Sequence, residues 1–425
     1  MNHHPTSRLA ALRWQFRTHG TYRRALWIIV LLLATALFAD FLANDKPLAC
    51  SYKGHTYFPV LQSYGKLLGK HQWPEEFHRE DWHARSYSWV IFPPIPYHPG
   101  YLDLQNTQFK SPFEHQTIKN WRFRHWLGTD MLGRDVLAGL IHGTRSALVV
   151  GLLGTLLALL IGIVAGGMSG YYGDDKFRAG PLAVLTGSVG LVLGSFYAIQ
   201  VVRLFSDVSN INAGMWLGIL AGVLVFILLF RGFWLLGKIM DKRWTKFRIR
   251  IPVDLILMRI IEAVQAMPGM LLLLALIPLF LYPAVSNVVL IVGLVRWPTV
   301  ARFVRGELLK IRVMPYIESA ELAGIPQERI LWRHALPNAL QPLLILAAFS
   351  ISSGVLLEAF LSFLGLGVPA DQVTWGSLLN LARKQFDAWW LALFPGLAIF
   401  LTVTAFNLAG DGLQEWLDGK KPYLR

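Results

Sequence analysis

The stretch PYIESAELAGIPQERILWRHALP, residues 315–337, lies between two long apolar segments and has the pattern of two short helices. Pro315 suits the first position of a helix, and Gly324 suits the left-handed residue that ends one. A second short helix is expected over Gln327–His334, directly after Pro326. The sequence therefore predicts a compact helix–turn–helix between two membrane helices.

Small side chains on the first of these helices would let the element insert into a groove of another protein. They are Ser319, Ala320 and Ala323. This pattern favours a docking element for a cytoplasmic partner. An amphipathic connector that rests on the membrane surface is the alternative, and the local sequence leaves both interpretations open.

The composition is that of a membrane protein. Of the 425 residues, 54% are hydrophobic and 16% are charged, whereas a soluble chain carries about 25% charged residues. The formal net charge of +14 comes from Lys and Arg. Because these residues cluster in short loops between apolar blocks, the positive-inside rule explains them better than a nucleic-acid-binding module does.

Eight apolar segments approach or exceed the roughly 20 residues that cross a bilayer. They are residues 25–43, 146–168, 181–202, 214–236, 254–282, 288–304, 341–363 and 389–408. An even number of spans places both termini on one side, and the basic residues of the N-terminus and of the loop 238–250 place that side in the cytoplasm. The stretch 302–340 is then cytoplasmic, and the loop with Asp371 and Trp375 is external.

We expect five parts along the chain. They are a basic cytoplasmic N-terminus (1–24), a first transmembrane anchor helix (25–44), a periplasmic segment (45–127), a transmembrane domain (128–410) and a cytoplasmic tail (411–425). The first apolar block is longer than the 7–15-residue core of a cleavable signal, so it is expected to remain as an anchor.

The periplasmic segment is expected to be a small folded unit, because it is rich in aromatic residues such as Trp73, Trp82 and Trp89. The single cysteine, Cys50, can form no intramolecular disulfide. It is also rejected as a lipidation site, because Pro47 stands where an aliphatic residue would be expected.

Two segments imitate nucleotide-binding motifs without the chemistry. Gly232–Ile239 resembles a phosphate-binding loop, but Ile239 has no hydroxyl for Mg²⁺ and the glycines end an apolar span. Residues 365–370 imitate a dinucleotide fingerprint, but Pro369 breaks the turn-to-helix geometry. No catalytic or metal-binding constellation is found, since the histidines are dispersed. Transport against a gradient would therefore take its energy from a partner or an ion gradient.

Residues 318–337 resemble the EAA loop of permease subunits in binding-protein-dependent ABC importers. That loop reads Glu-Ala-Ala, three residues, Gly, nine residues, a hydrophobic residue or His, any residue, and Leu-Pro. The matching residues here are Glu318, Ser319, Ala320, Gly324, His334, Leu336 and Pro337. The only departure in the core of the motif is Ser319, a small residue in place of a small residue.

Further segments resemble the dipeptide and oligopeptide branch of these permeases, including the microcin C type. They are Leu127–Leu137 (LGTDMLGRDVL), Met258–Glu262 (MRIIE) with Pro268, Leu361–Gly367 (LSFLGLG), Trp375-Gly376, Asn44–Leu48 (NDKPL) and Phe92–Tyr97 (FPPIPY). Residues 174–252 are the part of the chain that this resemblance does not cover.

The resemblance implies an all-α polytopic membrane protein with the type I ABC importer transmembrane fold. About eight spans are expected, six in the core plus an inserted two-helix hairpin at about 174–252, whose peripheral or partner-binding role stays open. It further implies a non-catalytic permease subunit that moves peptides or peptide-like compounds across the bacterial inner membrane. The chain itself is expected to need no cofactor and no metal.

The implied partners are cytoplasmic ABC ATPase subunits that bind the ATP, a second homologous permease subunit, a periplasmic substrate-binding protein and the lipid bilayer. Within the EAA loop, Glu318 is expected to make a charge-assisted contact with the ATPase, and Gly324 to form the turn that orients the element. The substrate itself is not implied by any residue.

An ion-coupled secondary transporter is the alternative function. It predicts acidic residues at corresponding places in two inverted halves, which the sequence does not contain. Glu358 and Arg296 lie in apolar spans and are candidates for the translocation path. Arg259 and Glu262, three residues apart on a helix, are expected to pair with each other.

Overall fold

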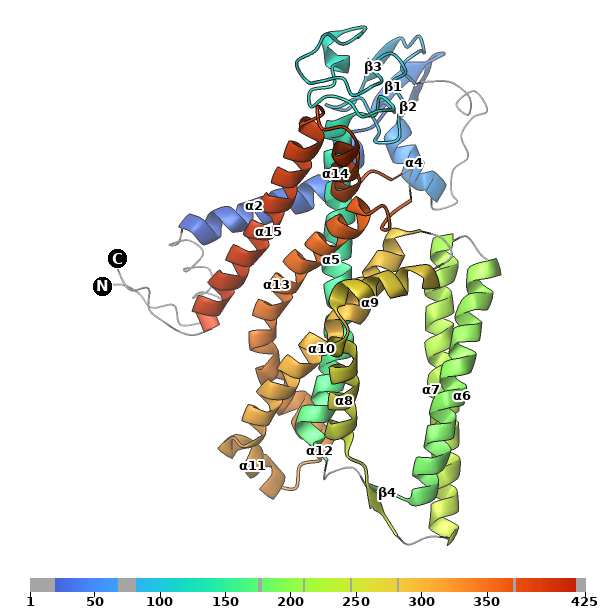
Figure 1. The fold of residues 1–425 in the computed structure, drawn as a ribbon, viewed down its shortest axis with the longest axis vertical. Coiled ribbons are helices and arrows are strands. Elements are labelled where there is room, and N and C mark those ends of the chain that lie inside the picture. The colour runs from blue at the N-terminus through green and yellow to red at the C-terminus, as the bar shows by residue number, and fades with distance from the viewer. Residues whose placement is uncertain are drawn as a thin grey trace, which may run out of the picture. The chain divides into compact units, whose positions relative to one another are not determined.

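The computed structural model describes residues 20–67, 82–174, 178–208, 211–244, 247–280, 283–369 and 372–417 (Figure 1). The chain folds as two compact units. The first comprises Met1–Leu159, Met270–Arg296 and Gln341–Arg425, and the second comprises Leu160–Gly269 and Trp297–Leu340.

Long apolar helices dominate both units, as the apolar segments predict. Within the described ranges, seven helices are long and apolar enough to cross a membrane, or eight if one broken pair is counted as a single span. The seven are α2 (Gly20–Leu37), α5 (Val136–Gly167), α6 (Pro181–Val208), α7 (Ile211–Trp244), α10 (Val285–Arg312), α13 (Leu336–Phe363) and α15 (Trp390–Leu417). The predicted all-α polytopic fold with about eight spans is confirmed.

The broken pair is the predicted span 254–282. Its first helix, α8, covers Val253–Ala266, and its second, α9, covers Gly269–Leu276. Between them Met267 is extended (φ −79°, ψ 131°), because the ring of Pro268 disfavours a helical conformation at the residue before it. A 3₁₀ turn, Ile277–Leu279, follows α9, and the predicted end at Tyr282 lies outside the described residues.

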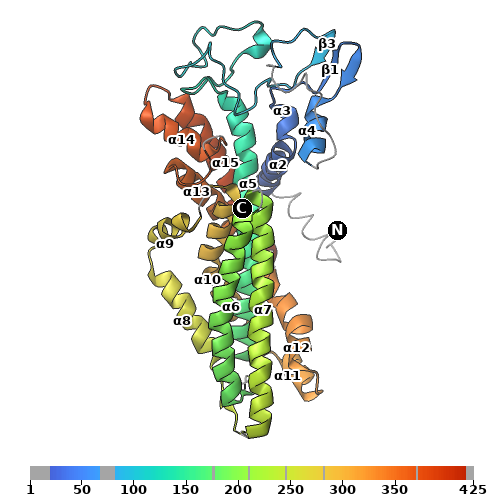
Figure 2. The ribbon, with the colours of Figure 1, turned by 90° about the vertical axis from the view of Figure 1, so that its right-hand side faces the viewer.

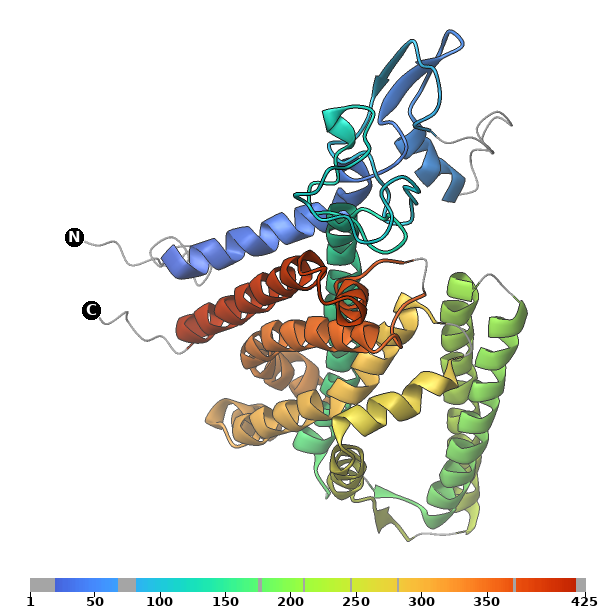
Figure 3. The ribbon, with the colours of Figure 1, turned by 45° about the horizontal axis from the view of Figure 1, so that its top comes forward.

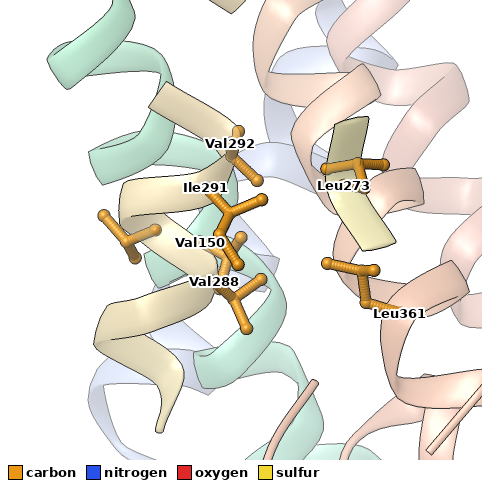
Figure 4. Close-up of a cluster of buried hydrophobic side chains, with 7 residues drawn as sticks. Val150, Leu273, Val288, Ile291, Val292 and Leu361 are labelled. Carbon is orange, nitrogen blue, oxygen red and sulfur yellow. The ribbon is translucent and has the colours of Figure 1, made fainter. Parts of the chain in front are cut away.

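An apolar cluster joins the helices of the first unit. Figure 4 shows Val150 of α5, Leu273 of α9, Leu361 of α13 and three branched residues of α10, all buried; the three are Val288, Ile291 and Val292. Small residues bring the backbones close, since a Cβ at Gly354 would lie 3.1 Å from the Cα atom of Gly151. In lipid, close packing of this kind stabilises helix contacts more than removal from water does.

The first span packs along the last one. Figure 3 shows α2 and α15 side by side, both within the first unit. The Tyr22 hydroxyl donates to Oε1 of Glu415 at 2.6 Å. Gly412 lies against the Tyr22 ring, where a Cβ would meet the nearest ring carbon at 3.0 Å. The predicted anchor helix is therefore part of the helix packing of this unit.

The segment between α3 (Ala39–Leu42) and α5 is folded, as its aromatic content predicts. Its described part contains a sheet of three strands in the order β2-β1-β3, all antiparallel. The strands are β1 (Ala49–Tyr52), β2 (His55–Tyr57) and β3 (Trp89–Ile91), and the helices are α4 (Pro59–Leu67) and the 3₁₀ turn Trp121–Phe123. Cys50 and Trp82 are buried and Trp89 is exposed, whereas Trp73 lies outside the described residues.

A buried charged cluster attaches this segment to the start of α5. His125, whose side chain is completely buried, contacts Asp135 through Nδ1 at 2.8 Å and Asp103 through Nε2 at 3.2 Å. The ring of Tyr97 stacks on it with 4.2 Å between the ring centroids. Burial alone would lower the pKa of His125, but hydrogen bonds to the two carboxylates and their charges raise it to about 9. The charged imidazolium can then donate from both ring nitrogens.

Helix α5 begins at Val136, ten residues before the predicted start of the second span, Ser146. The helix can include these ten residues because two polar side chains among them are paired. Nε2 of His142 lies 2.8 Å from a backbone carbonyl oxygen of the preceding segment. Arg145 contacts Asp40 at 2.7 Å. These residues lower the local hydropathy without ending the helix, so the apolar window alone places the start too late.

The inserted segment 174–252 forms the predicted two-helix hairpin in the second unit. Figures 1 and 2 show α6 and α7 running side by side, and glycines line their contact. A Cβ at Gly222 would lie 2.9 Å from the carbonyl oxygen of Ala198, and one at Gly237 would lie 2.4 Å from the Cα atom of Ala183. The small residues Gly222 and Gly237 of α7 are therefore used for close packing within the hairpin itself.

The base of the hairpin is closed in two ways that the sequence did not reveal. Strand β4 (Arg178–Ala179) pairs antiparallel with β5 (Ile249–Arg250). Asp241 of α7 caps the first turn of α6, where Oδ1 accepts from the Leu182 amide at 3.0 Å and Oδ2 from the Ala183 amide at 2.8 Å. A carboxylate at a helix N-terminus is favoured by the helix dipole.

Candidate functional site

The stretch 315–337 forms the predicted pair of short helices. Helix α11 covers Pro315–Leu322, with Pro315 at its first position, and α12 covers Gln327–Ile330 (Figure 1). A π-helical turn, Leu331–Ala335, then leads into α13. The second short helix is therefore α-helical for one turn only and continues in a wider form.

Gly324 ends α11 in the left-handed conformation, with a φ of +74°. The Gly324 amide donates to the carbonyl of Glu321 at 3.0 Å, and the Ile325 amide donates to that of Ala320 at 3.2 Å. These two bonds form a Schellman motif. A Cβ at Gly324 would meet nothing within 4 Å. Glycine is thus required here by the backbone conformation and not by lack of space.

The residues of the predicted EAA loop divide into exposed and buried groups. Glu318, Ser319, Gly324 and Pro337 are exposed, Ala320 and His334 are half-buried, and Leu336 is buried. The Ser319 hydroxyl donates to the carbonyl of Pro315 at 2.8 Å and so closes the first turn of α11. Leu322, which is 89% exposed, presents an apolar side chain beside the acidic ones.

Buried apolar side chains hold the two short helices against the rest of the second unit. Ile317 of α11 and Ile330 of α12 have no exposed surface. Nδ2 of Asn338, in the first turn of α13, donates to the Tyr316 hydroxyl at 3.1 Å and to the His334 carbonyl at 3.0 Å. The exposed residues of α11 are therefore presented by a turn that is fixed on both sides.

The end of α5 also contacts this element. A π-helical turn, Met168–Tyr172, follows α5. The hydroxyl of Tyr171, a fully buried residue, donates to Oε1 of Gln327 at 2.7 Å. Nε2 of Gln327 donates onward to Oε1 of Glu321 at 3.0 Å.

An ion pair within the second unit joins α8 to α10. Nε and Nη2 of Arg305 each lie 2.6 Å from an oxygen of Asp254, which is the two-point geometry that suits a guanidinium group. The Ser169 hydroxyl also donates to Asp254. The turn after α5 packs directly on α10, since a Cβ at Gly170 would lie 2.8 Å from the Arg305 carbonyl oxygen.

The two candidates for the translocation path are not brought together by any hydrogen bond or ion pair among the described residues. Glu358 of α13 is 1% exposed, and Oε1 accepts from the Ser362 hydroxyl at 2.7 Å. Its other oxygen, Oε2, is buried with no hydrogen-bond partner among the described residues, and the Thr374 side chain lies near the carboxyl group. Arg296 of α10 is half-buried. The predicted pair Arg259–Glu262 is confirmed, at 3.1 Å, and is exposed.

A cavity of about 510 Å³ lies within the first unit, beside the serine that binds Glu358. Its lining includes Phe280, Asn287, Ile291, Ser362 and Asn380. Most of the wall is apolar. Two of its polar side chains already form hydrogen bonds: the Ser362 hydroxyl donates to Glu358, and Nδ2 of Asn380 donates to the carbonyl of Phe363.

Sequence reasoning found the exposed part of the element but not its supports. Tyr171 and Gln327 are 156 positions apart, and Asp254 and Arg305 are 51 apart. No local sequence pattern predicts a contact in either pair, because the partners are far apart along the chain. The only available signal was the doublet Tyr171-Tyr172 between two glycines.

Comparisons with known proteins agree with this architecture. Residues 235–421 match the family described as binding-protein-dependent transport system inner membrane component. The chain is 31% identical to the glutathione transport system permease protein GsiD of Pectobacterium atrosepticum, across 70% of this chain and 73% of that protein.

Two further relatives are similar over most of their lengths. The di/tripeptide transport system permease protein DppC of Pseudomonas aeruginosa is 30% identical, across 71% of this chain and 75% of that protein. The inner membrane ABC transporter permease protein YejE of Escherichia coli is 26% identical, across 96% of both chains. The chain therefore belongs to the family of inner-membrane permease components of binding-protein-dependent transport systems.

Proposed function

We propose that this chain is the permease subunit of an ABC importer that moves peptides or peptide-like compounds inward, and that α11 and α12 dock on its ATPase. The observation that carries the proposal is the α11–Gly324–α12 element, with its exposed acidic and apolar side chains on a Schellman turn. Relatives named as glutathione and di/tripeptide permeases support the substrate class.

The charge of α11 distinguishes docking on a protein from resting on the membrane. Helix α11 carries Glu318 and Glu321 and no Lys or Arg. The cytoplasmic leaflet is negatively charged and attracts basic segments, so an acidic helix gains nothing there. An acidic helix with an exposed leucine, Leu322, instead suits a groove that has a basic rim and an apolar floor.

The remaining parts of the importer follow from this assignment. The permease itself is non-catalytic, and ATP is bound and hydrolysed by the partner ATPase on the cytoplasmic side, where α11 and α12 lie. A second homologous permease completes the path, and a periplasmic protein delivers the substrate. Both termini are cytoplasmic. Glu358 and Arg296 face the translocation path in at least one state of the transport cycle.

Reconstitution tests the proposal. The chain is copurified with its ATPase and second permease, placed in liposomes with the binding protein outside, and given an isotope-labelled peptide digest with ATP at the nucleotide-binding face. We expect ATP-dependent uptake of a subset of peptides, identified by mass spectrometry. Failure to copurify with an ATPase, or uptake driven by an ion gradient without ATP, would contradict the proposal.

A further inference from the structure

The hydrogen bonds from Tyr171 through Gln327 to Glu321 run from the interior of the second unit to its surface. Tyr171 is fully buried, Gln327 is half-buried and Glu321 is exposed on α11. The two distances are 2.7 Å and 3.0 Å. We refer to these three residues as the Tyr171 link.

The Tyr171 link joins three separate backbone elements. Tyr171 belongs to the π-helical turn that follows α5, Gln327 begins α12, and Glu321 lies in the last turn of α11. Gln327 is also the first helical residue after the left-handed turn at Gly324. A rotation of α11 about that turn therefore pulls on Gln327 before it reaches the rest of α12.

Packing beside the link is incomplete. A cavity of about 360 Å³ lies between the end of α5 and the α12 region, and its lining includes Met168, Tyr172, Glu328 and Trp332. At this cavity the packing between the two elements is interrupted. The hydrogen bond of Tyr171 bridges the same two elements where they are close.

Breaking the hydrogen bonds of the Tyr171 link is unfavourable. A buried tyrosine hydroxyl needs a hydrogen-bond partner, because leaving it unpaired away from water is unfavourable. The amide of Gln327 accepts from Tyr171 through Oε1 and donates to Glu321 through Nε2 at the same time. A displacement of α11 is therefore opposed unless the turn after α5 moves with it.

We infer that Tyr171 and Gln327 are positioning residues that couple the movement of the α11–α12 element to the C-terminal end of α5. This inference rests on the proposed function, since it takes the ATPase as the source of that movement. It assigns the Tyr171 hydroxyl a mechanical role that neither the EAA pattern nor the family match contains.

The test separates transmission from docking. Complexes with Tyr171→Phe and with Gln327→Leu are reconstituted as described above, and the number of peptide molecules taken up per ATP hydrolysed is measured with the labelled digest. We expect Tyr171→Phe, which lies outside the docking helices, to copurify with the ATPase and hydrolyse ATP, but with about a three- to tenfold lower ratio of peptide to ATP, the effect expected from one lost hydrogen bond. Gln327 begins the docking helix α12, so for Gln327→Leu the ratio is measured on complexes that retain the ATPase, and it should fall by the same factor. Tyr197→Phe removes a hydroxyl on the exposed side of α6 and should leave the ratio unchanged.

Further outcomes are informative. The double variant should be no worse than Gln327→Leu alone, because the two residues act as a unit. A normal ratio in both single variants would overturn the inference, and so would loss of ATPase binding by Tyr171→Phe, which would make the link a part of docking only. If the unchanged complex shows no ATP-dependent uptake, the proposed function fails instead.

Discussion

At the scale of single residues, Gly324 carries a conformation that other residues avoid. Its φ of +74° costs a residue with a Cβ about 1–2 kcal/mol, while the space around it is open. We therefore expect Gly324→Ala to weaken binding of the ATPase by about five- to thirtyfold through backbone strain alone. Titration of the ATPase onto the permease in detergent measures this affinity.

Gly306 provides the matched control. It lies within α10, and a Cβ there would also meet nothing within 4 Å, but its φ is not positive. Gly306→Ala should leave the affinity unchanged, since alanine is favoured in a helix interior. Equal affinities for Gly324→Ala and the unchanged chain would show that the left-handed turn is not needed for docking.

His125 gives the segment before α5 a dependence on pH. Its pKa is raised from 6.5 to about 9, because the hydrogen bonds and charges of Asp103 and Asp135 outweigh the effect of burial. The stabilisation, about 3 kcal/mol from this shift, is fully present below pH 6.5 and is lost as the pH rises through 9. We expect the segment to open more readily at pH 10 than at pH 7.

The buried Cys50 reports this opening. Its rate of reaction with a maleimide, divided by the rate of free glutathione at the same pH, should rise between pH 7 and pH 10. His125→Ala should raise the rate already at pH 7 and remove the pH dependence, whereas His115→Ala, at an exposed site, should change neither. A flat profile in the unchanged chain would contradict the role of this cluster.

At the scale of elements, apolar length predicted where helices exist and local chemistry decided where they end. The start of α5 was placed too late because Arg145 looks like an interruption until its contact with Asp40 is known. The break after α8 was hidden because apolar residues continue past Pro268 without a polar residue to mark it. Pairing and backbone preference, not hydropathy, set both boundaries.

The candidate site shows the same division. The α11–Gly324–α12 element could be predicted because its signals, Pro315, Gly324 and Pro326, are local in sequence. Its supports could not, because Tyr171 reaches Gln327 only once α5 and α12 have been brought together by the fold.

The α6–α7 hairpin predicts a specific steric effect. A Cβ at Gly237 would lie 2.1 Å from Oγ1 of Thr186. Gly237→Leu should therefore push the two helices apart and destabilise the hairpin by about 1–3 kcal/mol. Cysteines at Gly194 and Phe226, which are in contact, should form a disulfide in the unchanged hairpin and lose it when Gly237→Leu is added. Gly232→Leu, at a site with open space, should keep the cross-link; loss of it there too would argue against this packing.

At the scale of the whole molecule, the distribution of basic residues predicts the orientation in the membrane. Leu322 and Leu104 are similarly exposed, at 89% and 79%. In spheroplasts of cells that lack the ATPase, a membrane-impermeant maleimide should label Leu104→Cys directly and Leu322→Cys only after permeabilisation. Labelling of both from the same side would refute the predicted topology.

The central claim is that the α11–Gly324–α12 element delivers the energy of ATP hydrolysis to the permease. The most direct measurement compares ATP-dependent uptake of the labelled peptide digest by complexes with the unchanged chain and with Gly324→Asp, which adds backbone strain and a negative charge at the turn. We predict that the variant is inserted in the membrane in normal amount and that its ATP-dependent uptake falls to background. Normal uptake by Gly324→Asp would contradict the account.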